Sequence, residues 1–116
     1  MAVVLHLKFF FKYSPVLKFK VLEESMIPSL YPGDFVLVER ISYLLGDPKV
    51  GDLVVLLPPR GWNKKKLLIK KIQKVRDRVY FVVGENQKKS IDSRHFGLIS
   101  KKDIVGKVFY VSRKIS

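Results

Sequence analysis

The stretch EESMIPSLYPGD, residues 23–34, contains the residue best suited to nucleophilic chemistry, Ser25. It stands where an alternating apolar segment ends and a proline-punctuated loop begins. A serine hydroxyl becomes a good nucleophile when a neighbouring base takes its proton. The chain has no cysteine and two histidines, His6 and His95, neither of which is well placed to serve Ser25. The base is therefore expected to be a carboxylate or a lysine.

A lysine acts as a base only in its neutral form, so loss of hydration must lower its pKa from about 10.4 by several units. In LLIKKI, residues 67–72, Lys70 and Lys71 are both flanked by large aliphatic residues. In a strand these two lysines point to opposite faces. The residues alone leave three alternatives open: Lys70 is buried, Lys71 is buried, or both are solvated.

The segments that must position these groups alternate apolar and polar residues with a period of two, which is typical of strands. They are rich in Val, Phe and Tyr and are bounded by Gly, Pro, Asp or Asn. Strands are expected over 16–22, 34–40, 52–57, 78–83 and 104–111. Residues 65–75 also fit a short helix, but the surrounding strands favour another strand. We therefore predict a mainly β fold, a small single-domain twisted barrel or sandwich over residues 1–116.

The composition suits one folded domain with one modest core, because 47% of the 116 residues are hydrophobic. The net charge of +13 favours acidic surfaces such as nucleic acid or anionic lipid. The absence of cysteine removes disulfides, thiol catalysis and cysteine-based zinc sites. His95 has no carboxylate or cysteine partners that would make a metal site, so no metal and no cofactor are expected.

Residues 1–17 are apolar but are interrupted by His6, Lys8, Lys12 and Pro15. A spanning helix needs about 20 predominantly apolar residues, and no window here supplies them. The internal charges and the lack of a small-residue cleavage site argue against a cleavable signal peptide. We therefore expect a chain without a transmembrane helix, either soluble in the cytoplasm or peripheral at a membrane.

Residues 22–34 resemble the nucleophile box of the type I signal peptidases, serine–lysine endopeptidases that cut extended peptides after small residues. That box reads roughly Ser-Met-x-Pro-(Thr/Ser)-Leu-x-x-Gly-Asp. The matching residues are Ser25, Met26, Pro28, Ser29, Leu30, Gly33 and Asp34. Residues 49–59 resemble the family's Gly-Asp-(Ile/Leu)-Val-Val strand, 68–71 its lysine box, and 84–107 the box that contains Ser-x-Asp-Ser-Arg. Four boxes in the family's order cover about residues 17–111.

By this resemblance Ser25 would be the nucleophile and Lys70 its general base. Ser90 would hydrogen-bond to the Lys70 amine and orient it. Asp92 and Arg94 would form a structural pair that holds this last box beside the site. The backbone N–H of Ser25 would donate to the oxyanion, where charge develops in the transition state.

The resemblance also implies a partner, a peptide or precursor protein that binds as an added strand along residues 22–25 and 67–69. The expected substrate-binding residues are Leu22, Glu23, Glu24, Met26, Leu68 and Ile69. Met26 and nearby apolar residues would line the pocket for a small side chain.

Three departures from the family pattern stand out. Glu23 occupies the position two before the nucleophile, which is often Ser or Gly and can supply a second oxyanion donor. In a strand Glu23 and Ser25 would share a face, so the carboxylate would repel the oxyanion. Glu85 replaces the aspartate of Gly-Asp-Asn. The large extracytoplasmic insertion and the membrane anchor are expected to be absent, as in the short branch that includes nickel superoxide dismutase maturation proteases.

Other functions remain as alternatives. Glu23 keeps open a catalytically weak or inactive relative that only binds peptides. A basic β-module could bind single-stranded nucleic acid through aromatic side chains, namely Trp62, Tyr80, Phe81 and Tyr110. Binding to nucleic acid is not expected, because it leaves both serine-containing boxes unexplained. The self-cleaving domain of SOS-response repressors needs an upstream Ala-Gly or Cys-Gly, which residues 1–24 lack. Peripheral contact with an anionic membrane fits the charge, and the sequence does not indicate an oligomeric state.

Overall fold

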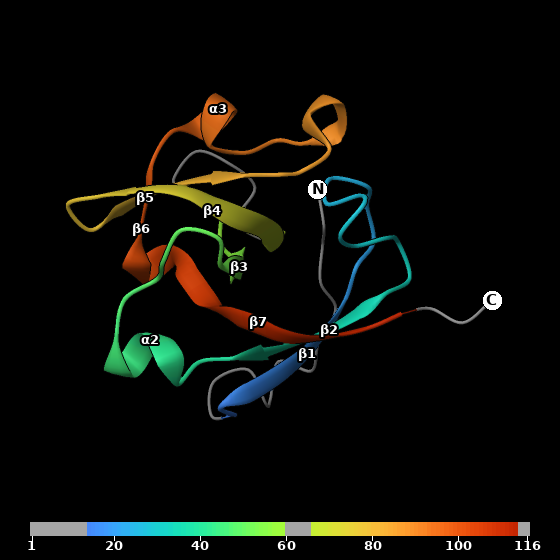
Figure 1. Ribbon diagram of the computed structural model, residues 1–116, viewed down its shortest axis with the longest axis horizontal. Helices are drawn as coiled ribbons and strands as arrows, with labels where there is room; N and C mark the ends of the chain where they lie inside the picture. The colour runs from blue at the N-terminus through green and yellow to red at the C-terminus, as the bar shows by residue number, and fades with distance from the viewer. Residues whose placement is uncertain (1–13, 60–65, 114–116) are drawn as a thin grey trace.

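The structure is a computed structural model that describes residues 14–59 and 66–113. The described strands form one antiparallel sheet in the order β1-β2-β7-β3-β4-β5-β6 (Figure 1). The strands are β1 (Val16–Lys20), β2 (Phe35–Glu39), β3 (Leu53–Leu56), β4 (Leu68–Arg76), β5 (Val79–Val83), β6 (Ile99–Ser100) and β7 (Ile104–Ser112). The helices are short: α2 (Ser42–Leu45), α3 (Ser93–Phe96) and the 3₁₀ turns η1 (Gln87–Lys89) and η2 (Lys101–Asp103).

The mainly β prediction is confirmed, and so is the strand expected within 65–75, which is β4. In β1 the period-two pattern works as expected: Leu17 and Phe19 are buried, whereas Lys18 and Lys20 are exposed. The strand expected over 16–22 ends earlier, at Lys20, and the backbone bends at residues 23–25. No helix in the described ranges has both the length and the apolar character needed to cross a membrane.

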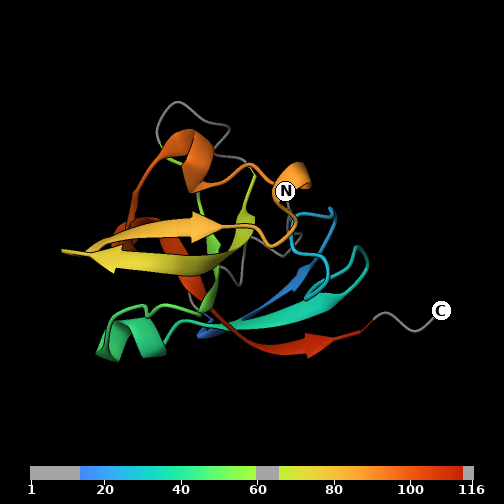
Figure 2. The same cartoon turned by 45° about the horizontal axis from the view of Figure 1, so that its top comes forward.

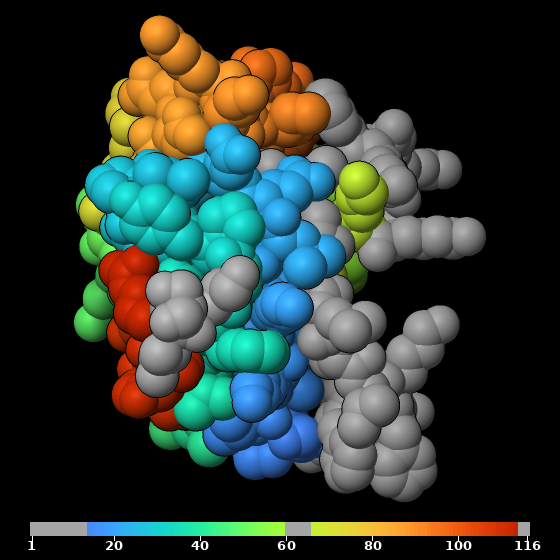
Figure 3. All heavy atoms as spheres, turned by 90° about the vertical axis from the view of Figure 1, so that its right-hand side faces the viewer, coloured from blue at the N-terminus to red at the C-terminus, as the bar shows by residue number. Residues whose placement is uncertain are grey.

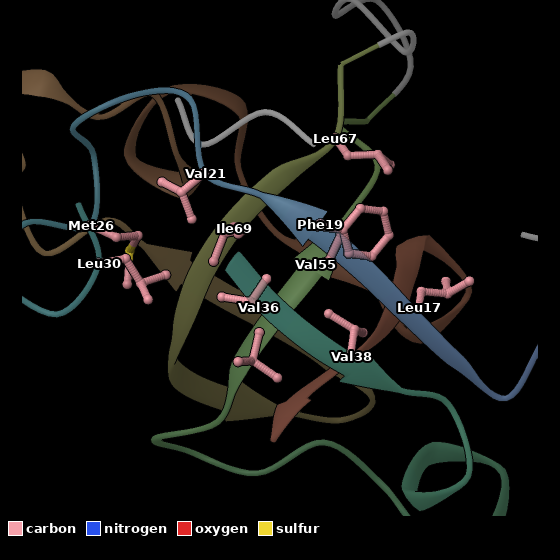
Figure 4. Close-up of a cluster of buried hydrophobic side chains, with 11 residues drawn as sticks. Leu17, Phe19, Val21, Met26, Leu30, Val36, Val38, Val55, Leu67 and Ile69 are labelled. Atoms are coloured by element: carbon pink, nitrogen blue, oxygen red, sulfur yellow. The ribbon is translucent and has the colours of Figure 1, made fainter. Parts of the chain in front are cut away.

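The sheet curls so that its first strands pack against its middle strands. A buried cluster joins Phe19 of β1 and Val36 of β2 to Val55 of β3 and Ile69 of β4 (Figure 4). In the sheet order β1 and β4 are separated by three strands, so their side chains can meet only if the sheet bends round. Bulges where β7 pairs with β2 and with β3 permit this bend. The result is a half-closed barrel.

A second buried cluster lies on the opposite face of β3 and β4. It is formed by Val54, Leu56, Leu68, Ile72, Tyr80, Val82 and Ile99. Leu68 and Ile72 lie two residues either side of Lys70, so strand alternation places Lys70 on this inward face. Of the two lysines, Lys70 is therefore the one that β4 turns toward the second cluster, and Lys71 points the other way.

Candidate active site

Ser25 lies in the 21–34 segment that connects β1 to β2. Two backbone hydrogen bonds close the base of this segment, Val21 N–H to Asp34 O and Gly33 N–H to Val21 O, both 2.8 Å. Ser25 is fully buried, and its Oγ has no hydrogen-bond partner among the described residues. Burying a hydroxyl without a partner costs about 1–3 kcal/mol, so such groups are rare outside functional sites.

Lys70 is fully buried in β4, whereas the side chain of Lys71 is 45% exposed. The Lys70 Nζ donates to Ser90 Oγ at 2.8 Å. Loss of hydration lowers the pKa of Lys70 from 10.5 to about 8, while the negative charges of Asp92 and Glu23 act against this shift. Lys70 therefore has the two properties that a lysine base needs, burial and a lowered pKa.

Ser90 continues a hydrogen-bond chain, because its Oγ donates to Asp92 Oδ2 at 2.8 Å. The Asp92 carboxylate caps α3 and also accepts from the Gly84 N–H at 2.9 Å and from the Arg94 guanidinium at 2.8 and 2.9 Å. Burial alone would raise the pKa of Asp92, but these hydrogen bonds from Arg94, Gly84 and Ser90 hold it well below its usual range. At neutral pH Asp92 is therefore an acceptor only, so Ser90 donates to Asp92 and accepts from Lys70.

Gly84 is the point at which the Ser25 segment and Ser90 meet. A Cβ on Gly84 would stand 2.8 Å from the Ser25 carbonyl oxygen and 2.2 Å from Ser90 Oγ. Both distances are too short for real Cβ contacts, so only glycine lets the two segments approach this closely. Figure 3 shows the 21–34 segment packed directly beneath the segment that follows β5.

Glu85 and Asn86 fasten the two segments together on either side of this contact. The Asn86 N–H donates to Ser25 O at 2.9 Å, and its side-chain amide donates to Glu24 O at 3.1 Å. The Ser29 hydroxyl donates to the Glu85 carboxylate at 2.6 Å to one oxygen and 2.8 Å to the other. Gly84, Glu85 and Asn86 were not among the expected site residues, although their match to the Gly-Asp-Asn pattern is a signal that points to them.

The two groups expected to act as nucleophile and base are not hydrogen-bonded to each other: Ser25 Oγ has no partner among the described residues, and the Lys70 amine donates to Ser90 Oγ. Among the other candidate site residues, Ser90 Oγ accepts from the Lys70 amine at 2.8 Å, and Arg94 pairs with Asp92 at 2.8 Å.

The expected substrate-binding residues divide into two groups. Met26 and Ile69 are buried in the first core cluster and Leu68 in the second, whereas Leu22 and Glu24 are exposed. With Met26 fully buried, its side chain supports the Ser25 segment from beneath (Figure 4). The bend at residues 23–25 removes the strand alternation that was expected to place Glu23 beside Ser25 on one face.

Two features would suit an extended peptide. Residues 68–70 of β4 pair with β3 along one edge, while the pairing with β5 begins only at Lys71, so no described strand covers the other edge of 68–70. A surface pocket of about 410 Å³ lies on the Ser25 side and is lined by Leu22, Glu23, Glu24, Pro32 and Lys89.

The described residues contain no group of three or more His, Asp or Glu side chains that could hold a metal ion. The aromatic residues considered for nucleic-acid binding are scattered in their exposure. Tyr80 is buried in the second core cluster, Phe81 is half-buried and Tyr110 is 56% exposed, whereas Trp62 lies outside the described residues.

The family model described as "Signal peptidase, peptidase S26" matches residues 1–74 and 71–112. The chain belongs to the signal peptidase family. It is 25% identical to the Probable signal peptidase I-1 of Synechocystis sp. over 75% of this chain and 66% of that protein. It is 27% identical to the Probable thylakoidal processing peptidase 2, chloroplastic, of Arabidopsis thaliana over 72% of this chain and 34% of that protein. The chain thus spans between about a third and two thirds of the length of these relatives.

Proposed function

We propose that the chain is a serine endopeptidase in which Ser25 is the nucleophile and Lys70 the general base. The observation that carries this proposal is the buried Lys70 amine, with a pKa of about 8 and its Nζ 2.8 Å from Ser90 Oγ. A neutral amine has two N–H groups and one lone pair. Because Ser90 can only accept from Lys70, one N–H is committed to Ser90, and the lone pair is left to turn toward Ser25.

The reaction follows from these roles. Ser25 Oγ attacks the carbonyl carbon of the scissile peptide bond and passes its proton to the neutral Lys70 Nζ. The resulting oxyanion would accept a hydrogen bond from the Ser25 backbone N–H. The C–N bond then breaks, and the leaving amine takes the proton from Lys70. Water then attacks the acyl–enzyme ester and passes a proton to Lys70, which gives it to Ser25 Oγ as the ester C–O bond breaks and the new carboxyl end leaves.

The proposed substrate is a leader or signal peptide that binds as an extended strand between residues 22–24 and the open edge of 68–70. Main-chain hydrogen bonds along such an edge supply affinity, and pockets for alternate side chains supply specificity. The small size of the residue before the cut, as in the family, is part of the proposal.

A cleavage profile tests this function. The chain is incubated with a peptide library and the products are identified by mass spectrometry, for the wild type, for Ser25→Ala and for Ser112→Ala. Ser112 lies exposed at the end of β7, opposite Phe35 in β2, and has no proposed role in catalysis or binding, so it serves as the matched control. We expect cuts after small residues by the wild type and by Ser112→Ala, and none by Ser25→Ala. Equal fragments from Ser25→Ala would overturn the proposal; retention of peptides without any cleavage by the wild type would identify a binding relative instead.

A further inference from the structure

Asn86 holds the backbone on both sides of the proposed nucleophile. Its N–H donates to Ser25 O at 2.9 Å, and its side-chain amide donates to Glu24 O at 3.1 Å. Asn86 stands at the N-terminal cap position of η1, but its side chain makes no capping hydrogen bond there. In Figure 2 the segment that follows β5 runs close to the 21–34 segment. The amide therefore acts on the backbone beside Ser25 and not on its own turn.

Glu24 O and the Ser25 N–H are the two ends of one peptide group. This peptide is trans, and a trans peptide is planar with its C=O and N–H pointing in opposite directions. A donor fixed on Glu24 O therefore fixes the direction of the Ser25 N–H as well. The Ile27 N–H also donates to Glu24 O, at 3.2 Å, so donors from two parts of the chain hold this one oxygen.

The Ser25 N–H itself remains available as a donor. No residue in the described part of the chain accepts a hydrogen bond from it. Linked hydrogen bonds polarise one another, so donors on a peptide carbonyl make the N–H of the same peptide group a stronger donor. The two hydrogen bonds on Glu24 O thus aim this N–H and strengthen it toward negative charge that develops beside Ser25.

We propose that Asn86 is a positioning residue for the oxyanion. Its side-chain amide holds the peptide between Glu24 and Ser25 so that the Ser25 N–H points at the substrate carbonyl oxygen as that oxygen becomes negative. The inference rests on the proposed function, in which Ser25 Oγ adds to that carbonyl. An interaction that strengthens only in the transition state raises kcat without tightening substrate binding. Asn86 should therefore contribute to kcat and leave KM unchanged.

Steady-state kinetics on a small-residue peptide test the proposal with two variants of Asn86. Asn86→Ala removes the amide but keeps the backbone N–H that donates to Ser25 O, and Asn86→Asp keeps the shape but replaces the donor by an acceptor. We expect both variants to lower kcat by about 10- to 100-fold, with KM changed by less than about twofold. Gln87→Ala removes an exposed amide from the next residue and should behave as the wild type does. Folding is checked by circular dichroism, and either Asn86 variant carries the test if the other does not fold.

A matched pair of ligands separates this role from a general loosening of the site. Ser25 Oγ adds to the carbonyl carbon of a peptide aldehyde that ends in alanine: the Oγ–C bond forms, the C=O π pair moves to the oxygen, and the hydroxyl proton goes to Lys70. The corresponding peptide alcohol has no carbonyl and binds through its other contacts alone. Fluorescence anisotropy of labelled ligands measures both affinities. Asn86→Ala should bind the aldehyde about 10- to 100-fold more weakly than the wild type does, and the alcohol equally well.

The outcomes distinguish Asn86 from the base and from the nucleophile. Wild-type kcat in the folded Asn86 variants would overturn the proposal, as would equal losses of affinity for the aldehyde and the alcohol. The rise of kcat/KM with pH should stay in place in Asn86→Ala, because Asn86 is not among the groups that shift the pKa of Lys70; a displaced rise that accounts for the whole loss would overturn the proposal too. Normal cleavage by Asn86→Ala counts against Asn86 alone, whereas a wild type that binds the aldehyde no more tightly than the alcohol counts against Ser25 as the nucleophile, and the inference falls with it.

Discussion

Lys70 places an amine in the core, and the loss of hydration there determines the pH at which the amine could act as a base. Its pKa is lowered to about 8, and only the neutral form can accept the Ser25 proton. We therefore expect kcat/KM on a small-residue peptide to rise with pH through about 8 and to level off above it. The measurement is a pH–rate profile with the profile of protein stability recorded alongside.

Substitutions at Lys70 and Lys71 test whether the rise of kcat/KM with pH reports the loss of a proton from Lys70. Lys70→Arg should be inactive at every pH, because a guanidinium stays charged. Lys71→Ala should keep both the rate and the limb, since the Lys71 side chain is 45% exposed. Turnover that is lost in Lys71→Ala but kept in Lys70→Ala would show that Lys71, and not Lys70, is the base.

Glu23, which lies outside β4, also affects the pKa of Lys70. Its negative charge raises the pKa of Lys70 and so acts against the loss of hydration. Glu23→Gln removes this charge, so the Lys70 pKa should fall further and the limb of the pH–rate profile should move to lower pH. Glu24→Gln is the matched control, because Glu24 is exposed and is not among the charges that shift Lys70. An unmoved limb in Glu23→Gln would show that Glu23 does not act on the base.

At the scale of elements, Gly84 controls how closely the end of β5 approaches the Ser25 segment. In Gly84→Ala the new Cβ would overlap Ser90 Oγ and the Ser25 carbonyl oxygen, so the nucleophile and the group that holds Lys70 must move apart. A displacement of about 1 Å in a catalytic group can lower the rate by about 10²-fold, and we expect a loss of that order in kcat.

Gly46→Ala provides the control for that loss. A Cβ on Gly46 would have its nearest contact at 3.6 Å, an ordinary distance, and Gly46 lies at the end of α2. Near wild-type kcat is expected for Gly46→Ala, with both variants folded by circular dichroism. Wild-type kcat in Gly84→Ala would mean that the close approach is not required for turnover.

Asp92 accepts the hydrogen bonds that hold the segment around α3 together, and the contribution of Asp92 to stability should vary with pH. Asp92→Asn replaces an acceptor oxygen by a donor opposite N–H and O–H groups, which should lower the free energy of unfolding by about 2–4 kcal/mol at neutral pH. The folded-state pKa of Asp92 lies below its unfolded value of 3.8, so this stability is present above 3.8 and is lost as pH falls through the folded pKa. Urea unfolding at several pH values should show the gap between wild type and variant narrowing in acid; a gap that is constant with pH would contradict this.

The strands could be predicted from the sequence where they depend only on the residues within one short segment. Alternation along residues 16–20 and the run of Val, Tyr and Phe over 79–83 indicate strands, and the four boxes indicate the family. Alternation could not choose between Lys70 and Lys71, because the choice depends on which face of β4 meets the second core cluster. The bend at 23–25 and the contact at Gly84 were also out of reach, since both arise where segments distant in sequence pack together.

On the scale of the whole molecule, the curled sheet decides which groups act together. The 21–34 segment and the 84–92 segment follow strands on different parts of the sheet, and the curl brings them face to face (Figure 3). The first core cluster anchors the Ser25 segment through Met26 and Leu30, both fully buried against β2 and β4. The Ser25 segment is therefore fixed to the same core that joins β1 and β2 to β3 and β4.

The charge of the whole molecule should influence how fast substrates arrive. At +13 the chain attracts negative charge over distances longer than a contact, whereas the carboxylates of Glu23 and Glu24 act only locally beside Ser25. A peptide with an acidic tail several residues from the cut should therefore show a kcat/KM about tenfold higher than the same peptide with a basic tail at low salt. Near 1 M salt, where the Debye length is about 3 Å, the two values should converge. Matched neutral-tail peptides test whether the tails act through charge alone, and a ratio that does not change with salt would show that the tails bind at the site instead.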